Sequence, residues 1–229
     1  MGATELSKKL KYHPATISRI LQILNKKGFL RQDEKTRKFM LGSAANKLGK
    51  GIFTPFANDL LLIAKPYLRE LSELLGETVV LQVVFGDSAV CVDVVQGTRG
   101  LSIRFNPGDR IPVHVSPGGK VILSYYDPED IDKLFSRGFQ SFTHKTITDL
   151  DVFKRELQMA REQGVAFGRE EATVGVNAIG VPVLDPKGIP IAAVLVVRLA
   201  SKVEYDLNSP EIVSMKKIAD EIGRQIGLS

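Results

Sequence analysis

The chain has 229 residues, 44% of them hydrophobic and 25% charged, which is typical of a globular protein with one large domain or a small and a medium one. The sequence has no run of about 18 apolar residues, and its first residues lack the pattern of a signal peptide. The single cysteine, Cys91, excludes an internal disulfide. We therefore expect a cytoplasmic protein with no membrane partner. The net charge of +5 is unevenly distributed along the chain. Residues 1–50 hold 12 Lys or Arg against 3 Asp or Glu, whereas residues 51–229 hold 19 against 23. This distribution favours a polyanion-binding head on a near-neutral body.

Two short helices are predicted in the basic head. The first covers residues 4–10, and the second covers residues 14–26, where proline opens the helix and a glycine follows its end. Helical spacing in the second helix predicts a buried stripe of Ile17, Ile20, Leu21 and Leu24. Its other face carries short polar groups, a methyl group and a guanidinium group, which suit the major groove of DNA. The predicted DNA-contacting residues of this region are His13, Ala15, Thr16, Ser18, Arg19 and Gln22.

A β-hairpin is predicted next. Residues 29–32 and 39–42 are short apolar segments on either side of a charged turn. Lys35, Arg37 and Lys38 belong to that turn and can reach DNA phosphates. A lysine-rich surface on a small helical domain is the alternative interpretation. Two helices followed by a basic hairpin are more specific than charge alone and favour a DNA-binding domain over residues 1–42.

The following segments predict a connector and a mixed body. Residues 41–52 predict a helix of moderate quality, and residues 56–75 predict a strong helix that Pro66 should kink or restart. In the body we expect strands at residues 77–85, 89–95, 101–105, 179–184 and 189–197, and helices at residues 119–125, 128–135, 150–163 and 210–226. Thr148 with Asp151 predicts a capping box for the third of these helices. This order of elements is typical of an α+β fold.

The loop at residues 116–120 is the candidate ligand site. Ser116 is suited to cap a helix and Pro117 to begin it. Gly118 and Gly119 have no side chains, so their N–H groups are open to an anion such as a carboxylate. The alternative is a helix start in which glycine only permits close packing.

The sequence does not predict an enzyme. His13, His114 and His144 are scattered, and no spacing typical of a metal site, a nucleophile elbow or a phosphate loop occurs. Ser116 lies two residues after His114, but capping explains it. We therefore expect no catalytic residue, no metal and no cofactor. A DNA-independent sensor or oligomerisation module remains an alternative function, and a small hydrolase is a weaker one.

Segments of both parts resemble the IclR family of transcription regulators. In the head, residues 5–6, 15–21, 27–30 and 39–42 are similar to the winged helix-turn-helix of that family. In the body, the segments similar to its effector-binding domain are residues 65–68, 76–79, 108–114, 119–120, 146–149, 161–166, 170–171, 182–183 and 192–193. Each body segment is weak alone, whereas their order and spacing are specific.

The resemblance implies a domain organisation and partners. It implies an α+β fold with a winged helix-turn-helix at residues 1–42, a linker helix at 43–55 and a GAF-like effector-binding domain with a central antiparallel sheet at 56–229. It also implies a homodimer or tetramer, in our interpretation a repressor, on a palindromic operator of double-stranded DNA. The family has a further helix before residue 4, so we expect that the natural chain begins upstream of this start.

The resemblance also implies an effector pocket. It places a carboxylate of a small organic acid at residues 117–119. Positions that are polar or thiol-bearing in organic-acid-binding relatives correspond here to Gly168, Ala178, Leu195 and Val197. None of these side chains forms hydrogen bonds, so we expect a partly apolar effector, such as an aromatic or longer aliphatic acid. Arg169 is a candidate charge partner for it, although pairing with Glu170 or Glu171 is equally plausible.

Overall fold

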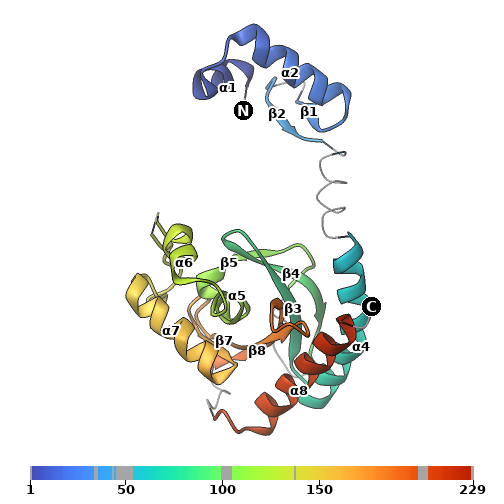
Figure 1. Ribbon diagram of the computed structural model, residues 1–229, viewed down its shortest axis with the longest axis vertical. Helices are drawn as coiled ribbons and strands as arrows, with labels where there is room; N and C mark the ends of the chain where they lie inside the picture. The colour runs from blue at the N-terminus through green and yellow to red at the C-terminus, as the bar shows by residue number, and fades with distance from the viewer. Residues whose placement is uncertain are drawn as a thin grey trace. The chain divides into compact units, whose positions relative to one another are not determined.

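The computed structural model describes residues 2–33, 36–42, 44, 54–98, 105–136, 138–200 and 206–227. The chain forms two compact units, residues 1–58 and residues 59–229, which are described separately (Figure 1). Lys35, most of the helix expected at residues 41–52, and positions 101–104 of an expected strand lie outside the described residues. No helix in the described ranges is long and apolar enough to span a bilayer.

The N-terminal unit contains two helices and a hairpin. Helix α1 covers Ala3–Leu10 and α2 covers Pro14–Lys26, as their apolar spacing and Pro14 predict. Strands β1 (Leu30–Gln32) and β2 (Phe39–Leu41) pair antiparallel at the predicted hairpin. Gly42 follows β2, and a Cβ on it would lie 2.2 Å from the Gly28 carbonyl oxygen. Glycine is therefore required where the end of the hairpin meets the end of α2.

The predicted apolar stripe of α2 is only partly buried. Ile17 and Leu21 are buried, and Leu24 is half-buried. The prediction is wrong for Ile20, whose exposed fraction is 46%. Helix α1 packs against α2, and no described element of this unit covers the side of α2 that carries Ile20.

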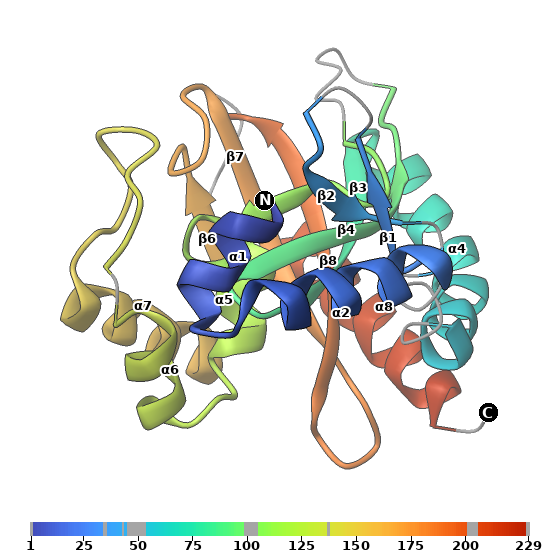
Figure 2. The same cartoon turned by 90° about the horizontal axis from the view of Figure 1, so that it is seen from above.

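The C-terminal unit is built on a six-stranded antiparallel sheet with the order β5-β4-β3-β8-β7-β6. The strands are β3 (Thr78–Phe85), β4 (Ser88–Val95), β5 (Arg110–Pro112), β6 (Ala166–Arg169), β7 (Val176–Leu184) and β8 (Pro190–Leu199). Figure 2 shows β7 and β8 side by side as a long hairpin. The α+β class and the antiparallel sheet predicted from the sequence are confirmed.

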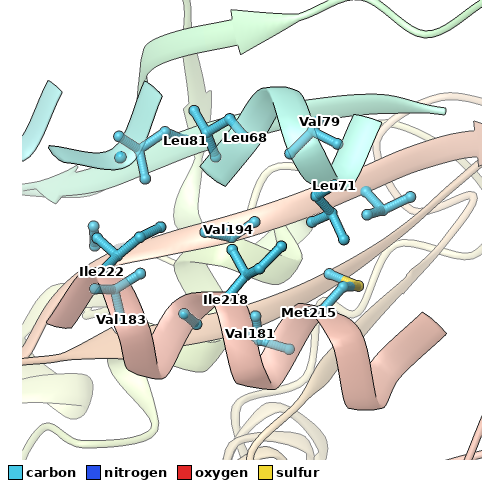
Figure 3. Close-up of a cluster of buried hydrophobic side chains, with 14 of the residues drawn as sticks. Leu68, Leu71, Val79, Leu81, Val181, Val183, Val194, Met215, Ile218 and Ile222 are labelled. Carbon is cyan, nitrogen blue, oxygen red and sulfur yellow. The ribbon is translucent and has the colours of Figure 1, made fainter. Parts of the chain in front are cut away.

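One face of the sheet is covered by two helices, α4 (Thr54–Leu75) and α8 (Pro210–Ile226). Alternate residues of β3, β7 and β8 point toward these helices and form the largest core. Figure 3 shows part of that core, in which Leu71 of α4 and Met215 of α8 belong to the same cluster as Val79 and Val194 of the sheet. Because side chains alternate along a strand, the neighbouring residues Val80, Gln82, Leu195 and Val197 belong to the opposite face.

The opposite face carries the elements that form the candidate site. These are the short turn η1 (Val113–Val115) and helices α5 (Pro117–Leu123), α6 (Pro128–Leu134) and α7 (Leu150–Gln163) (Figure 1). Helix α5 packs on β7 and β8, and α7 packs on α5 and β6. A glycine in β7, Gly180, permits this approach, because a Cβ there would lie 2.8 Å from the carbonyl carbon of Pro117.

Several predicted boundaries need correction. Helix α4 is continuous through Pro66 rather than restarting there. The cap of α7 is Asp149, whose carboxylate accepts a hydrogen bond from Val152 N at 2.8 Å, and not the expected Thr148. Phe105 is not part of a strand. The short strands β5 and β6 were not predicted.

Candidate functional site

The N-terminal unit presents most of the predicted DNA-contacting residues to solvent. Ala15, Thr16, Arg19 and Gln22 of α2 are exposed, and Ser18 is half-buried. His13 caps α2, because its Nδ1 accepts a hydrogen bond from Ala15 N at 3.3 Å. This helix therefore combines a buried apolar side with an exposed side that carries a guanidinium group and hydrogen-bonding groups.

The hairpin turn next to α2 is held by its own hydrogen bonds. Asp33 Oδ1 accepts from Thr36 N at 2.7 Å, and Gln32 Nε2 donates to the Arg37 carbonyl oxygen at 2.9 Å. Arg37 has a positive φ of 55°, and both Arg37 and Lys38 are exposed. Their cationic side chains can therefore meet phosphates without first being released from a buried position.

The C-terminal unit contains a cavity of about 260 Å³ on the α5 face of the sheet. Six of the nine predicted effector residues line it, and Gly118, Gly119 and Arg169 do not. The full lining is Gln82, Phe105, Ile111, Val115, Ser116, Pro117, Gly168, Glu171, Ala172, Thr173, Val176, Ala178, Leu195 and Val197. Most of these side chains are apolar, so the cavity suits a ligand with an apolar body.

The start of α5 is fixed to the sheet at one end of the cavity. Ser116 Oγ accepts from Gly119 N at 3.4 Å and donates to Gln82 Oε1 at 2.6 Å. A Cβ on Gly118 would lie 2.5 Å from that same oxygen, so Gly118 packs directly on β3. The two glycines thus serve close packing, and Ser116 and Pro117 are the residues of this loop that face the cavity.

A buried group of charges lies beside the cavity. Lys120 of α5 is fully buried, and its Nζ donates to Glu171 Oε1 at 2.6 Å and to the Phe167 carbonyl oxygen at 3.1 Å. Glu156 Oε1 lies 3.4 Å from the same Nζ. Burial raises the pKa of Glu171, and the nearby Lys120 charge opposes that change. The ion pair joins α5 to the segment after β6.

Arg169 lies on the outer side of this charge group. Its Nη1 is 3.5 Å from Glu156 Oε1, and its guanidinium stands 5.0 Å from the centroid of the Phe167 ring. Its neighbour Glu170 pairs instead with Lys145 and accepts from Gly175 N at 2.8 Å. Arg169 was a candidate partner for an effector, but it does not line the cavity.

His114, which was considered above for catalysis, and the single thiol of the chain, Cys91, are both buried. His114 Nε2 lies 2.9 Å from the Gln140 carbonyl oxygen, and its ring packs among Phe135, Phe139 and Phe142. Burial lowers the pKa of His114. Burial, with nearby carboxylates, raises the pKa of the Cys91 thiol to about 11. Among the described residues, no three His, Cys, Asp or Glu side chains form a metal site.

Three polar residues of the cavity, Gln82, Glu171 and Thr173, were not found by sequence reasoning, and the first two are the most deeply buried. Gln82 is a single amide within the apolar run of β3, and that isolated polarity was the signal available. Glu171 follows another glutamate in the sequence and therefore looks like surface charge, yet its exposed fraction is 4%. Only the fold brings these two residues to one cavity.

Comparison with known proteins connects both units to regulators. Residues 57–226 match the family model for the C-terminal part of the bacterial transcriptional regulator IclR. The chain is 30% identical to the HTH-type transcriptional repressor AllR of Klebsiella pneumoniae, with 98% of this chain and 81% of the relative covered. It is also 30% identical to the HTH-type transcriptional regulator KdgR of Dickeya chrysanthemi, with 97% and 74% covered. These two relatives are named as regulators and not as enzymes.

A solved structure has the same fold. The IclR structure of Thermotoga maritima aligns with 99% of this chain and 91% of that chain, at a TM-score of 0.71 and 25% sequence identity. The alignment spans both units of the chain, so each has a counterpart in that protein.

Proposed function

This chain belongs to the IclR family of bacterial transcriptional regulators, and from that premise we propose that it binds an operator in duplex DNA under the control of a small effector. We assign residues 1–42 to DNA binding, 43–55 to a linker helix and 56–229 to effector binding. In this proposal a homodimer or tetramer binds a palindromic site and acts as a repressor.

The observation that carries the DNA-binding proposal is the two-sided character of α2. Ile17 and Leu21 anchor the helix in its unit, whereas Arg19 and Gln22 are exposed on the same helix. Arginine and glutamine can form paired hydrogen bonds with base edges in the major groove. Arg37 and Lys38 on the hairpin supply phosphate contacts that fix the register.

The cavity supports an effector with an apolar body. Ala178, Leu195 and Val197 line it from β7 and β8 and offer no hydrogen bonds through their side chains. We propose a small, partly apolar carboxylic acid whose carboxylate lies at the Ser116 end. Very small polar acids would leave the apolar wall unfilled and would bind weakly.

A DNA-binding titration tests the proposal. Fluorescence anisotropy with a labelled duplex from upstream of the coding region should give an affinity that falls steeply between 50 and 200 mM salt, on the order of 10³-fold for about six phosphate contacts. A scrambled duplex is the control for specificity. A folded full-length protein that binds no duplex would instead support the DNA-independent sensor.

The effector half has its own test. Calorimetry with benzoate, phenylacetate and hexanoate should detect binding, whereas glyoxylate and pyruvate should bind weakly or not at all. Micromolar binding of glyoxylate or pyruvate, with no binding of the larger acids, would contradict the proposed apolar effector.

A further inference from the structure

One loop forms both part of the cavity wall and part of its rim. The loop joins β6 to β7 over residues 170–175. Glu171, Ala172 and Thr173 line the cavity, and in that order they are buried, half-buried and exposed. The loop therefore runs from the interior of the cavity to solvent, and a movement of its outer residues would widen the opening.

The inner end of the loop is firmly anchored. Glu171 Oε1 accepts from Lys120 Nζ at 2.6 Å, and the carbonyl oxygen of Glu171 accepts from Thr146 Oγ1 at 2.8 Å. The carbonyl oxygen of Glu170 accepts from Thr143 Oγ1, also at 2.8 Å. Because breaking a buried ion pair is costly, Glu170 and Glu171 form a fixed base for the loop.

The outer end of the loop is held less firmly. Gly175 has a positive φ of 82°, and its N–H group donates to Glu170 Oε2 at 2.8 Å. The exposed fraction of Val174 is 64%, so a displacement of residues 172–174 would expose little further apolar surface. The hydrogen bond from Gly175 to Glu170 is therefore an important restraint on this end.

We propose that residues 172–174 form a flap that controls access to the cavity. The flap turns about Gly175, whose N–H group is released from Glu170 Oε2, while Glu171 stays bound to Lys120. The inference concerns entry into the cavity. It holds for whatever ligand the cavity takes and does not depend on the proposed class of effector.

A thiol placed on the cavity wall reports the opening of the flap without any ligand. Position 197 lines the cavity and is 3% exposed, so Val197→Cys supplies a nearly isosteric probe in the full chain. Its reaction with dithionitrobenzoate is followed by the absorbance of the released thionitrobenzoate. The wild type, whose Cys91 is buried, gives the background rate.

A strained hinge should open the flap more often. In Gly175→Ala the new Cβ meets no atom within 4 Å, so the substitution acts through the backbone conformation alone. Gly188→Ala is the matched control, because its φ is 78°, its Cβ also meets nothing within 4 Å, and it lies in the turn at the other end of β7. Added to Val197→Cys, Gly175→Ala should speed labelling by about 5- to 30-fold, and Gly188→Ala by less than about twofold.

The restraint on the hinge gives a second, independent pair of variants. Glu170→Ala removes the acceptor of the Gly175 N–H group and should speed labelling by about 3- to 30-fold. Glu170→Gln loses the ion pair with Lys145 but keeps an oxygen for that N–H group, so its rate should stay within about twofold of the Val197→Cys protein.

Three results would overturn the flap. Equal acceleration by Gly175→Ala and Gly188→Ala would mean that labelling follows overall unfolding rather than a local opening. Unchanged rates in both Gly175→Ala and Glu170→Ala would mean that this loop does not limit access. Labelling of the folded Val197→Cys protein as fast as that of the urea-unfolded chain would mean that the cavity is always open.

Discussion

The hydroxyl group of Ser116 donates to the carboxamide oxygen of Gln82 across 2.6 Å, in a fully buried setting. The same hydroxyl oxygen accepts from the N–H group of Gly119, the third residue of α5. One side chain therefore sets where α5 begins and ties that point to the central strand β3. The end of the cavity formed by Ser116 and Pro117 depends on this link.

Removing that hydroxyl should destabilise the effector-binding unit. Ser116→Ala leaves Gln82 Oε1 without its donor and uncaps α5, so we expect the free energy of unfolding to fall by about 1–3 kcal/mol. Urea denaturation measures the change. The matched control is Ser124→Ala at the other end of α5, where the half-buried hydroxyl bonds only to the Val121 carbonyl oxygen. An equal loss in both variants would contradict the dual role of Ser116.

Glycine at position 180 should be required for the seating of α5. In Gly180→Ala the new methyl group would lie 2.8 Å from the Pro117 carbonyl carbon, so backbone must move, and we expect a loss of about 1–3 kcal/mol. Gly168→Ala is the comparison, since the nearest contact of its methyl group is the Pro117 ring, at 3.1 Å, and the nearest backbone atom is 3.8 Å away. Thermal unfolding should rank Gly180→Ala well below Gly168→Ala. The reverse order would show that the backbone contact is not limiting.

The sequence predicted those elements whose ends carry strong local signals. Helices α2, α7 and α8 occupy the predicted residues, because proline, capping side chains and glycine mark their ends and apolar residues repeat between them. Strands β5 and β6 have three and four residues, too few for a visible alternation. Ile20 was expected to be buried but is exposed. Helical spacing shows which face of a helix is apolar, but it does not show whether another element covers that face.

The sequence predicted only the part of the candidate site that is formed by residues adjacent in the chain. Ser116 and Pro117 stand together in sequence, and their helix-start signal is visible there. Gln82 and Glu171 are separated by 89 positions in the numbering, and only the sheet order brings β3 and the segment after β6 to one cavity. From the sequence alone, the buried Glu171 cannot be distinguished from its neighbour Glu170. The lysine that pairs with Glu171, Lys120, lies in α5, 51 positions earlier in the chain.

Stability should decline as His114 becomes protonated. Burial lowers its pKa from the usual 6.5, so just below pH 6.5 the unfolded chain binds more protons than the folded one. The contribution of His114 is present above pH 6.5 and is lost as the pH falls through the folded-state pKa. Glu171, with its raised pKa, acts in the opposite direction as the pH approaches 4.5.

The effect of His114 is isolated by comparison with a non-titrating variant. Urea denaturation between pH 8 and pH 5.5 should show a smaller drop in unfolding free energy for His114→Asn than for the wild type. If the two pH profiles run parallel, His114 does not titrate differently in the folded chain.

Cys91 should be unreactive in the folded protein. Its thiol is buried and has a pKa of about 11, so almost no thiolate is present at pH 8. Iodoacetamide at pH 8 should alkylate the urea-unfolded chain within minutes and leave the folded chain largely unmodified, as mass spectrometry would report. Rapid alkylation of the folded chain would contradict the burial of this residue.

Arg19 should contribute more to DNA affinity than an equal charge elsewhere. Arg19→Ala should weaken binding to the upstream duplex by about 10- to 100-fold, the value of a paired contact with a base. Lys187→Ala removes one positive charge from the exposed β7–β8 turn and should have little effect. Equal effects of the two variants would mean that net charge, and not the α2 face, carries the affinity.

The central claim is that a ligand in the cavity changes the affinity for DNA. The most direct measurement is the dissociation constant for the upstream duplex, by anisotropy, with and without a saturating amount of whichever acid tested by calorimetry binds most tightly. We expect a change of at least about fivefold in the wild type, within the usual range of allosteric coupling, and none in Ala178→Phe, whose ring would fill the cavity. An unchanged dissociation constant at saturation would contradict the account.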